Sequence, residues 1–265
     1  MSLDRRQFTG LLAGILAGSA LRPEGQASAS TAATAADPCN PPPQLKGLKP
    51  MLDGVEPITA AERARRVERA RQLMVETGIG AVVMEPGTNM SYYTAVRWGQ
   101  SERPFVAVLP ARGEMAFVSP GFEEARAREL TPAGAEVRVW QEDESPYAVI
   151  AGILRDRGLA TGTIGVEAET RFFISDGVRR EAPAATYLNA DPVTVGCRSI
   201  KSAAELALMQ RASDITVAAF GAAFATLREG MTQYELSENM TVAMRRLGGS
   251  EPWALVGFGE ASALP

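Results

Sequence analysis

The chain has 265 residues, with 27 lysines and arginines against 31 aspartates and glutamates, so its formal net charge is −4. This balance argues against a nucleic-acid-binding protein, because such proteins need a basic excess to displace counterions from phosphates. The sequence contains no histidine, which excludes Ser-His-Asp, Cys-His and histidine–zinc chemistry within this chain.

The N-terminal 29 residues have the order of an export signal. Arg5 and Arg6 precede a weakly apolar run at residues 11–21, and an Ala-x-Ala site follows at residues 27–29. This order is typical of a signal peptide, and the run is too short for a transmembrane helix. The arginine pair, followed by Gln7-Phe8, resembles the twin-arginine export motif. We therefore expect a periplasmic or secreted protein without a stable membrane anchor; the alternative is a basic N-terminal helix.

Residues 30–56 are rich in alanine and threonine and then in proline. Such a composition cannot bury a core, so we expect a disordered tether. Cys39 and Cys197 are too few for a disulfide framework or a zinc site. Cys197 ends an apolar run, where a small core residue is the simpler interpretation.

Residues 57–197 alternate between predicted helices and strands, which indicates an α/β layer with helices on its faces. The first helix begins at the capping box Thr59–Glu62 and ends at Gly78. A turn is expected at residues 86–89. Strands are predicted at residues 81–84, 105–109, 115–118, 136–140, 163–167 and 193–197, and further helices at 123–130, 145–158 and 172–180.

Residues 198–265 have a different character. Capping boxes at residues 202–205 and 232–235 open two helices, which end near Glu229 and Gly248. An apolar strand is predicted at residues 253–258. Two helices and one strand cannot enclose a core, so we interpret this segment as the beginning of an incomplete domain.

These segments in this order resemble the creatinase/prolidase/aminopeptidase P family of pita-bread metallopeptidases. The resemblance is carried by residues 73–94, by Ser101-Glu102-Arg103-Pro104, by Arg198-Ser199-Ile200-Lys201-Ser202 with Glu205, and by residues 230–236 and 253–265. It implies a creatinase-type N-terminal α/β domain at residues 57–197, followed by the first helices and strand of a pita-bread α+β domain at residues 198–265.

The resemblance also implies two divalent metal ions, Mn, Co or Zn, for a full-length family member. In the family, a run like Ala263-Leu264-Pro265 is followed by a substrate-binding histidine and then by the metal ligands. None of those positions is present here, so we expect no metal ligand, catalytic residue or cofactor in this chain. The pairs Glu123/Glu124 and Glu142/Glu144 are more simply solvated surface residues.

Five residues are candidates for substrate contact. The family's N-terminal domain often forms dimers and can reach the active site of a neighbouring subunit, so we expect a homodimer. Arg97 and Arg103 could bind a substrate carboxylate through the planar guanidinium. The full set is Tyr93, Arg97, Trp98, Arg103 and Phe258; surface arginines and packed aromatics are the simpler alternative.

The sequence therefore predicts an exported Xaa-Pro peptidase-like protein, whose full-length form would hydrolyse proline-containing peptides with bound metal. This chain alone is predicted to be inactive. Two alternatives remain open: a creatinase-like C–N hydrolase, and a non-catalytic dimerisation or binding module.

Overall fold

The computed structural model describes residues 41–250 and 252–263. The chain divides into two compact units, Met51–Thr216 and a second unit that combines Met1–Pro50 with Val217–Pro265. Arg5, Arg6, Cys39 and the predicted signal peptide lie outside the described residues. Within the described part, no helix has the length and apolarity needed to cross a membrane.

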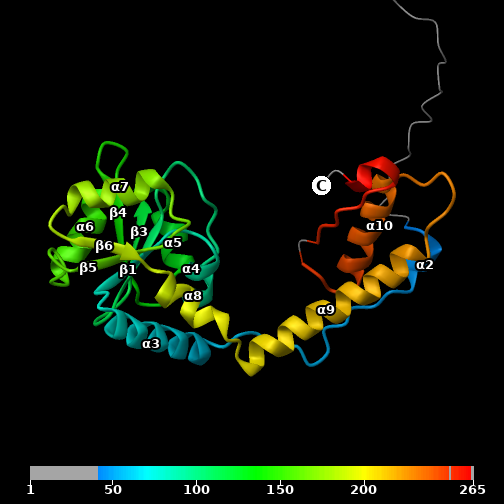
Figure 1. Cartoon of the computed structure of the whole chain (residues 1–265), viewed down its shortest axis with the longest axis horizontal. Helices are drawn as coiled ribbons and strands as arrows, with labels where there is room; N and C mark the ends of the chain where they lie inside the picture. The colour runs from blue at the N-terminus through cyan, green and yellow to red at the C-terminus, as the bar shows by residue number, and fades with distance from the viewer. Residues whose placement is uncertain (1–40, 251, 264–265) are drawn as a thin grey trace, which may run out of the picture. The chain divides into compact units, whose positions relative to one another are not determined.

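The larger unit is built on a six-stranded mixed sheet of order β4-β3-β2-β1-β5-β6 (Figure 1). β1 pairs antiparallel with β2, and β2 with β3, whereas the β3–β4, β1–β5 and β5–β6 pairs are parallel. The α/β class is therefore confirmed. The strands are β1 Ala81–Met84, β2 Val106–Pro110, β3 Ala116–Pro120, β4 Glu136–Trp140, β5 Thr163–Val166 and β6 Thr186–Asn189.

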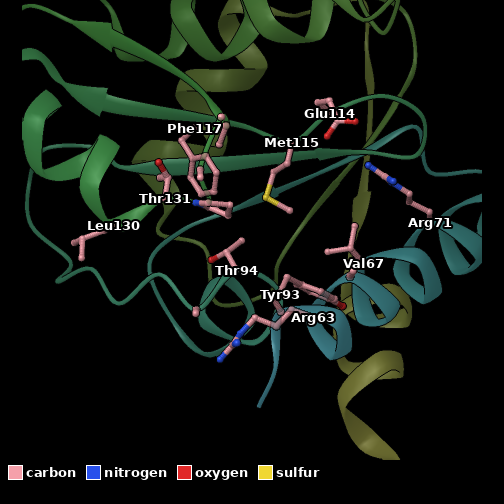
Figure 2. A pocket seen from close by; sticks show the side chains of 17 residues that line it. Arg63, Val67, Arg71, Tyr93, Thr94, Glu114, Met115, Phe117, Leu130 and Thr131 are labelled. Carbon is pink, nitrogen blue, oxygen red and sulfur yellow. The ribbon is translucent and has the colours of Figure 1, made fainter. Parts of the chain in front are cut away.

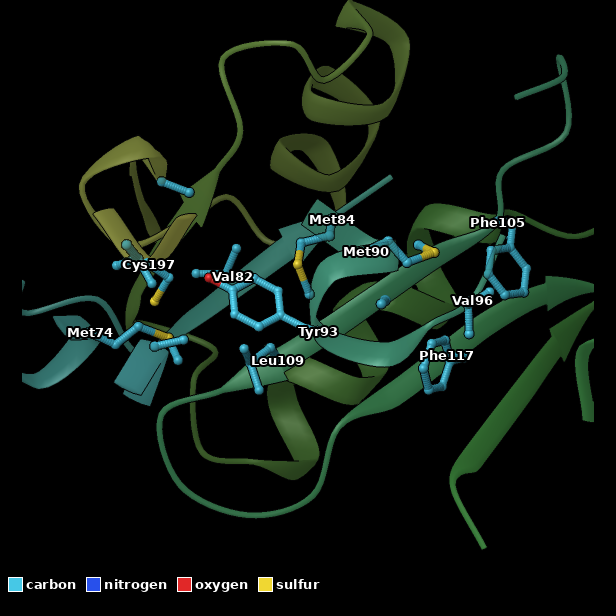
Figure 3. Packing of buried hydrophobic residues seen from close by; sticks show 14 of the residues in the cluster. Met74, Val82, Met84, Met90, Tyr93, Val96, Phe105, Leu109, Phe117 and Cys197 are labelled. Atoms are coloured by element: carbon cyan, nitrogen blue, oxygen red, sulfur yellow. The ribbon is translucent and has the colours of Figure 1, made fainter. Parts of the chain in front are cut away.

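Alternate strand residues enter two separate hydrophobic cores, because successive side chains of a strand point to opposite faces. In β1, Val82 and Met84 enter one core, and Ala81 and Val83 enter the other. Figure 3 shows the first core, where Leu109 lies near Tyr93. The first core is covered by α3 Ala60–Thr77, α4 Thr88–Thr94, α5 Glu124–Leu130 (after the 3-10 turn η1 Gly121–Glu123) and α8 Asp191–Ser199, and the second by α6 Pro146–Asp156 and α7 Phe172–Glu181.

Helix α3 begins and ends as its sequence predicts. The Thr59 Oγ1 accepts a hydrogen bond from the Glu62 N–H at 3.1 Å, which satisfies one free donor of the first turn. At the other end, Gly78 has φ 71°, and its N–H bonds back to the carbonyls of the last turn. Glycine adopts this left-handed conformation without steric cost.

The predicted strand at residues 193–197 is wrong, because these residues lie in helix α8. Its β-branched residues favoured the strand interpretation. Two local features favour the helix: Pro192 occupies its first turn, and the Asn189 Oδ1 accepts the Asp191 N–H at 2.9 Å. The strand that the sequence analysis missed is β6, which lies at the sheet edge and is largely exposed.

The turn predicted at residues 86–89 is followed directly by the short helix α4, which the sequence analysis also missed. This helix ends at Ala95, whose φ of 67° is left-handed and whose N–H donates to the Ser91 carbonyl. A left-handed alanine carries a steric cost that glycine would not. Because this position is not a glycine, the end of α4 carries no recognisable signal in the sequence.

The second unit holds α2 Pro43–Lys46, the end of α9 Ala203–Phe224, α10 Gln233–Arg246 and the 3-10 turn η2 Gly259–Ala263. The capping box that opens α10, formed by Thr232 and Glu235, is confirmed. In the segment predicted to be a tether, α2 contacts α10 and buries Leu45 completely. Burial of this leucine stabilises the turn of helix against α10.

Residues 252–258 form no strand, contrary to the prediction for residues 253–258. Trp253 is 76% exposed and Leu255 is 75% exposed. A strand needs a hydrogen-bonded neighbour, and none of the described residues pairs with this segment. Its position is instead held by side chains of α10: Ser237 donates to the Ala254 carbonyl, and Gln233 accepts from the Phe258 N–H.

Candidate functional site

Trp98 and Arg103 lie in the loop between α4 and β2, where they pack against neighbouring aromatic and charged side chains. The Trp98 ring stacks on Phe105 with centroids 4.0 Å apart and an interplanar angle of 7°. The Arg126 guanidinium lies 4.4 Å from the Trp98 centroid, which adds a cation–π contact. Phe105 is buried and directly precedes β2, so this stack holds Trp98 against the beginning of that strand.

Arg103 has its charge neutralised within the domain. Its Nε donates to Glu142 at 2.7 Å, and its NH1 donates to Glu102. The hydrogen bond to Glu142 raises the pKa of Arg103 above its ordinary value. Arg97 is exposed on the same loop. Arg103 therefore already binds two carboxylates, whereas the Arg97 side chain is open to solvent.

Tyr93 lies in the core, with 2% of its surface exposed. Burial, followed by contact with Cys197, raises its pKa far above the ordinary value. Desolvation likewise raises the pKa of the Cys197 thiol, so neither group is an activated nucleophile. Phe258 belongs to the second unit and is 38% exposed. Substrate contact therefore remains a prediction for all five candidates.

A cavity of about 670 Å³ lies between α3, α4 and the region around β3. Figure 2 shows Met115 and Phe117 on one side of it, and Val67 and Tyr93 on the other. Arg63 and Arg71 of α3 flank the cavity, and each is tied to a backbone carbonyl, of Ile58 and Gly113 respectively. Most of the cavity wall is apolar, and Glu114 is the one carboxylate among its lining residues.

A buried polar network joins α3 to the start of α9. The Arg66 NH2 lies 2.8 Å from the Glu62 carboxylate and 3.2 Å from that of Glu205. The Ser202 Oγ donates to Glu62 at 2.8 Å. This hydrogen bond is the main cause of the lowered pKa of Glu62, although burial opposes it. Ser202 and Glu205 also form the predicted capping box, since the backbone N–H of each donates to the side chain of the other. Together these contacts hold the beginning of α9 against the α/β layer.

A second polar cluster lies where β1 and β5 end, and the sequence analysis did not single it out. Glu85 is buried and accepts three hydrogen bonds from Arg171, one of them from the backbone N–H. Beside it, Asn89 donates to Glu167 and accepts from Arg198. One feature of the sequence points to this cluster: Glu85 and Glu167 each directly follow an apolar strand, and ligand sites of α/β sheets lie at such strand ends.

The described residues do not suit a pair of divalent cations. Residues 41–250 and 252–263 contain no group of three or more histidine, cysteine, aspartate or glutamate side chains placed to hold a metal ion. The buried carboxylates of Glu85 and Glu62 are already occupied by arginine. A dinuclear site needs carboxylates free to bind metal.

Comparison with known proteins gives two family matches in chain order. Residues 66–200 match the Creatinase/Prolidase N-terminal domain, and residues 207–265 match Metallopeptidase family M24. An uncharacterized peptidase of Schizosaccharomyces pombe is 32% identical over 239 residues, which are 84% of this chain and 51% of that protein. The creatinase of a Bacillus strain is 26% identical over 208 residues, 76% of this chain and 50% of the relative.

The dipeptidase PepE of Mycobacterium ulcerans has a related structure, with a TM-score of 0.66 and 24% identity over 73% of this chain and 52% of that one. The chain belongs to the creatinase/prolidase/M24 family, and M24 is a metallopeptidase family. It spans about half the length of the curated relatives named above.

Proposed function

We propose that this chain is the N-terminal part of an exported Xaa-Pro peptidase-like hydrolase. It supplies the α/β domain and the first helices of the M24 domain, and the residues that bind the two metal ions belong to sequence beyond it. The main support is the order of the two family matches, 66–200 and then 207–265. Prolidases and dipeptidases among the relatives favour peptide substrates.

The exposed apolar side chains of the second unit support the same proposal. Phe220, Phe224 and Trp253 are 44%, 52% and 76% exposed. Large apolar groups gathered in one small unit are typical of a surface that another protein segment covers. We propose that the remainder of an M24 domain covers them, and that the complete protein forms a homodimer.

The reading frame downstream of Pro265 tests the proposal directly. The expected frame continues through an M24 domain, and the longer protein releases proline from an Xaa-Pro dipeptide in the presence of Mn²⁺. Hydrolysis of creatine without dipeptide cleavage would instead establish the C–N hydrolase, an alternative that the match to a creatinase favours. A stop codon directly after Pro265 would contradict the proposal and support a non-catalytic binding module. Light scattering of the longer protein measures its dimerisation.

A further inference from the structure

We propose that the α/β unit contains a binding site for a free α-amino acid, in the cavity at the carboxyl ends of β1 and β5. The cavity has a volume of about 420 Å³, which is within the range of small-molecule sites. Its wall is formed by Glu85–Asn89, Gln100, Glu167–Thr170, Asp191, Val195 and Arg198. The proposal concerns the N-terminal α/β domain and does not depend on the proposed peptidase activity.

The position of this cavity in the sheet favours ligand binding. Strands β1 and β5 are parallel neighbours. The helix after β1, α4, packs in the first core, whereas the helix after β5, α7, packs in the second core on the opposite face. The two connections therefore diverge at the strand ends and leave a crevice. In open α/β sheets, ligands bind in such crevices at the point where the connections change face.

Two opposite charges stand close together in the cavity without neutralising each other. The Asn89 side-chain amide separates them: its Nδ2 donates to Glu167 at 2.5 Å, and its Oδ1 accepts from the Arg198 Nε at 2.5 Å. Neither Glu167 nor Arg198 forms an ion pair with another described residue. The Arg198 terminal nitrogens also form no hydrogen bond within this part of the chain, so the guanidinium retains donors for a carboxylate.

The spacing of these charges selects the ligand. Glu167 and the Arg198 Nε contact the two ends of one amide group, so a ligand that bridges the two side chains carries its ammonium and its carboxylate a short distance apart. In an α-amino acid a single carbon separates these two groups. The cavity wall also carries more carboxylates than guanidinium groups. Of these carboxylates, only that of Glu85 forms an ion pair with a described residue, Arg171. An ammonium group therefore meets a favourable potential there.

A further polar atom on the cavity wall lacks a partner. The Thr170 Oγ1 is buried and forms no hydrogen bond within the described residues. A buried hydroxyl without a partner loses free energy relative to water, and rotation of the Thr170 side chain toward the cavity would bring its hydroxyl within reach of a ligand. Burial also raises the pKa of Glu167 to about 7, which an adjacent ammonium would lower again.

Isothermal titration calorimetry of the full chain with L-alanine at pH 8 tests the proposal. We expect saturable binding in the millimolar range or tighter. β-Alanine, in which two carbons separate the charges, should bind at least tenfold more weakly. Methylammonium and acetate each supply one charge and should bind more weakly than L-alanine. No heat with L-alanine, or equal affinity for β-alanine, would overturn the proposal.

Variants of the two assigned residues test the site. Arg198→Gln and Glu167→Gln should each weaken L-alanine binding at least tenfold, whereas Arg198→Lys should retain part of it. Arg179→Gln and Glu76→Gln, which alter exposed side chains away from the cavity wall, are the matched controls and should bind as the unaltered chain does. Circular dichroism verifies that each variant is folded. Unchanged affinity in a folded Arg198→Gln protein would contradict the site.

Discussion

Arg66 of α3 and Glu205 of α9 form an ion pair at 3.2 Å, with side chains that are 9% and 17% exposed. Arg66 is the first residue of the segment that matches the Creatinase/Prolidase N-terminal domain, and Glu205 lies two residues before the segment that matches the M24 family. The same guanidinium holds Glu62 and lies 4.1 Å from the centroid of the Tyr92 ring. Arg66 is therefore the residue on which the junction between the two matched segments depends.

Replacement of this arginine should destabilise the α/β unit strongly. Arg66→Met leaves the carboxylates of Glu62 and Glu205 without a cation, and a broken buried pair costs about 3–5 kcal/mol. Urea unfolding measures the change. The double variant Glu62→Gln/Arg66→Met should regain part of the loss because one of the two charges is removed. Arg69→Met, on the exposed face of the same helix, should change stability by less than about 1 kcal/mol.

Ala95→Gly should stabilise the chain. The alanine has φ 67° at the end of α4, and relief of this left-handed conformation is worth about 1 kcal/mol. The melting temperature is the measurement. Gly78→Ala gives the reciprocal control, because Gly78 has φ 71° and open space around the position of a Cβ atom; it should lose a similar amount. An Ala95→Gly protein that melts lower than the unaltered chain would contradict the assigned strain.

Glu167 should make stability fall as pH rises from about 4.5 to 7. Its folded-state pKa of about 7 lies above the unfolded value of 4.5, chiefly because of burial. The folded state therefore binds more protons in this window, and ionisation opposes folding by roughly 1–3 kcal/mol. Repulsion from the nearby carboxylates of Glu169 and Glu85 raises the pKa of Glu167 in the same direction, whereas the hydrogen bonds from Asn89 and from the Glu85 backbone lower it.

Urea unfolding of the unaltered chain and of Glu167→Gln at pH 5 and pH 7 isolates this effect. The difference in stability between the two proteins should shift in favour of the glutamine variant as pH rises. A difference that does not change between the two pH values would show that Glu167 ionises normally in the folded protein.

Residues 1–265 alone should retain no stoichiometric divalent metal and should not hydrolyse an Xaa-Pro dipeptide. The reason is the donor set: there is no histidine, and the described part of the chain offers no cluster of metal-ligating side chains. Elemental analysis after loading with Mn²⁺ or Zn²⁺ and dialysis measures the first outcome, and a proline-release assay the second. Retained metal together with proline release would refute the prediction.

The export signal is tested by Arg5→Lys/Arg6→Lys, since the twin-arginine route depends on the arginine pair. We expect the double variant to remain in the cytoplasm while the unaltered chain reaches the periplasm, as measured by fractionation. Arg63→Lys/Arg65→Lys, well beyond the signal, is the control and should be exported. Normal export of the first variant would contradict the twin-arginine interpretation.

The sequence predicted the elements whose signals are local. Thr59 and Gly78 mark both ends of α3. The apolar runs of β2 and β3 predict buried strands, and their residues enter the two cores alternately. Helix α8 was missed because β-branched Val193, Thr194 and Val195 suggest a strand, whereas tertiary packing of Val193 and Cys197 decides for a helix. The cluster of Asn89, Glu167 and Arg198 joins three distant segments, and such proximity depends on the order of strands in the sheet.

The three tryptophans lie in environments that differ enough to report on the two units separately. Trp140 is 6% exposed in the α/β unit and donates to the Pro104 carbonyl, Trp98 is stacked on Phe105, and Trp253 is 76% exposed in the second unit. Emission from Trp253 should therefore resemble that of the indole in water, while Trp140 should emit at shorter wavelength. Fluorescence of a Trp253→Phe protein would then follow unfolding of the sheet alone.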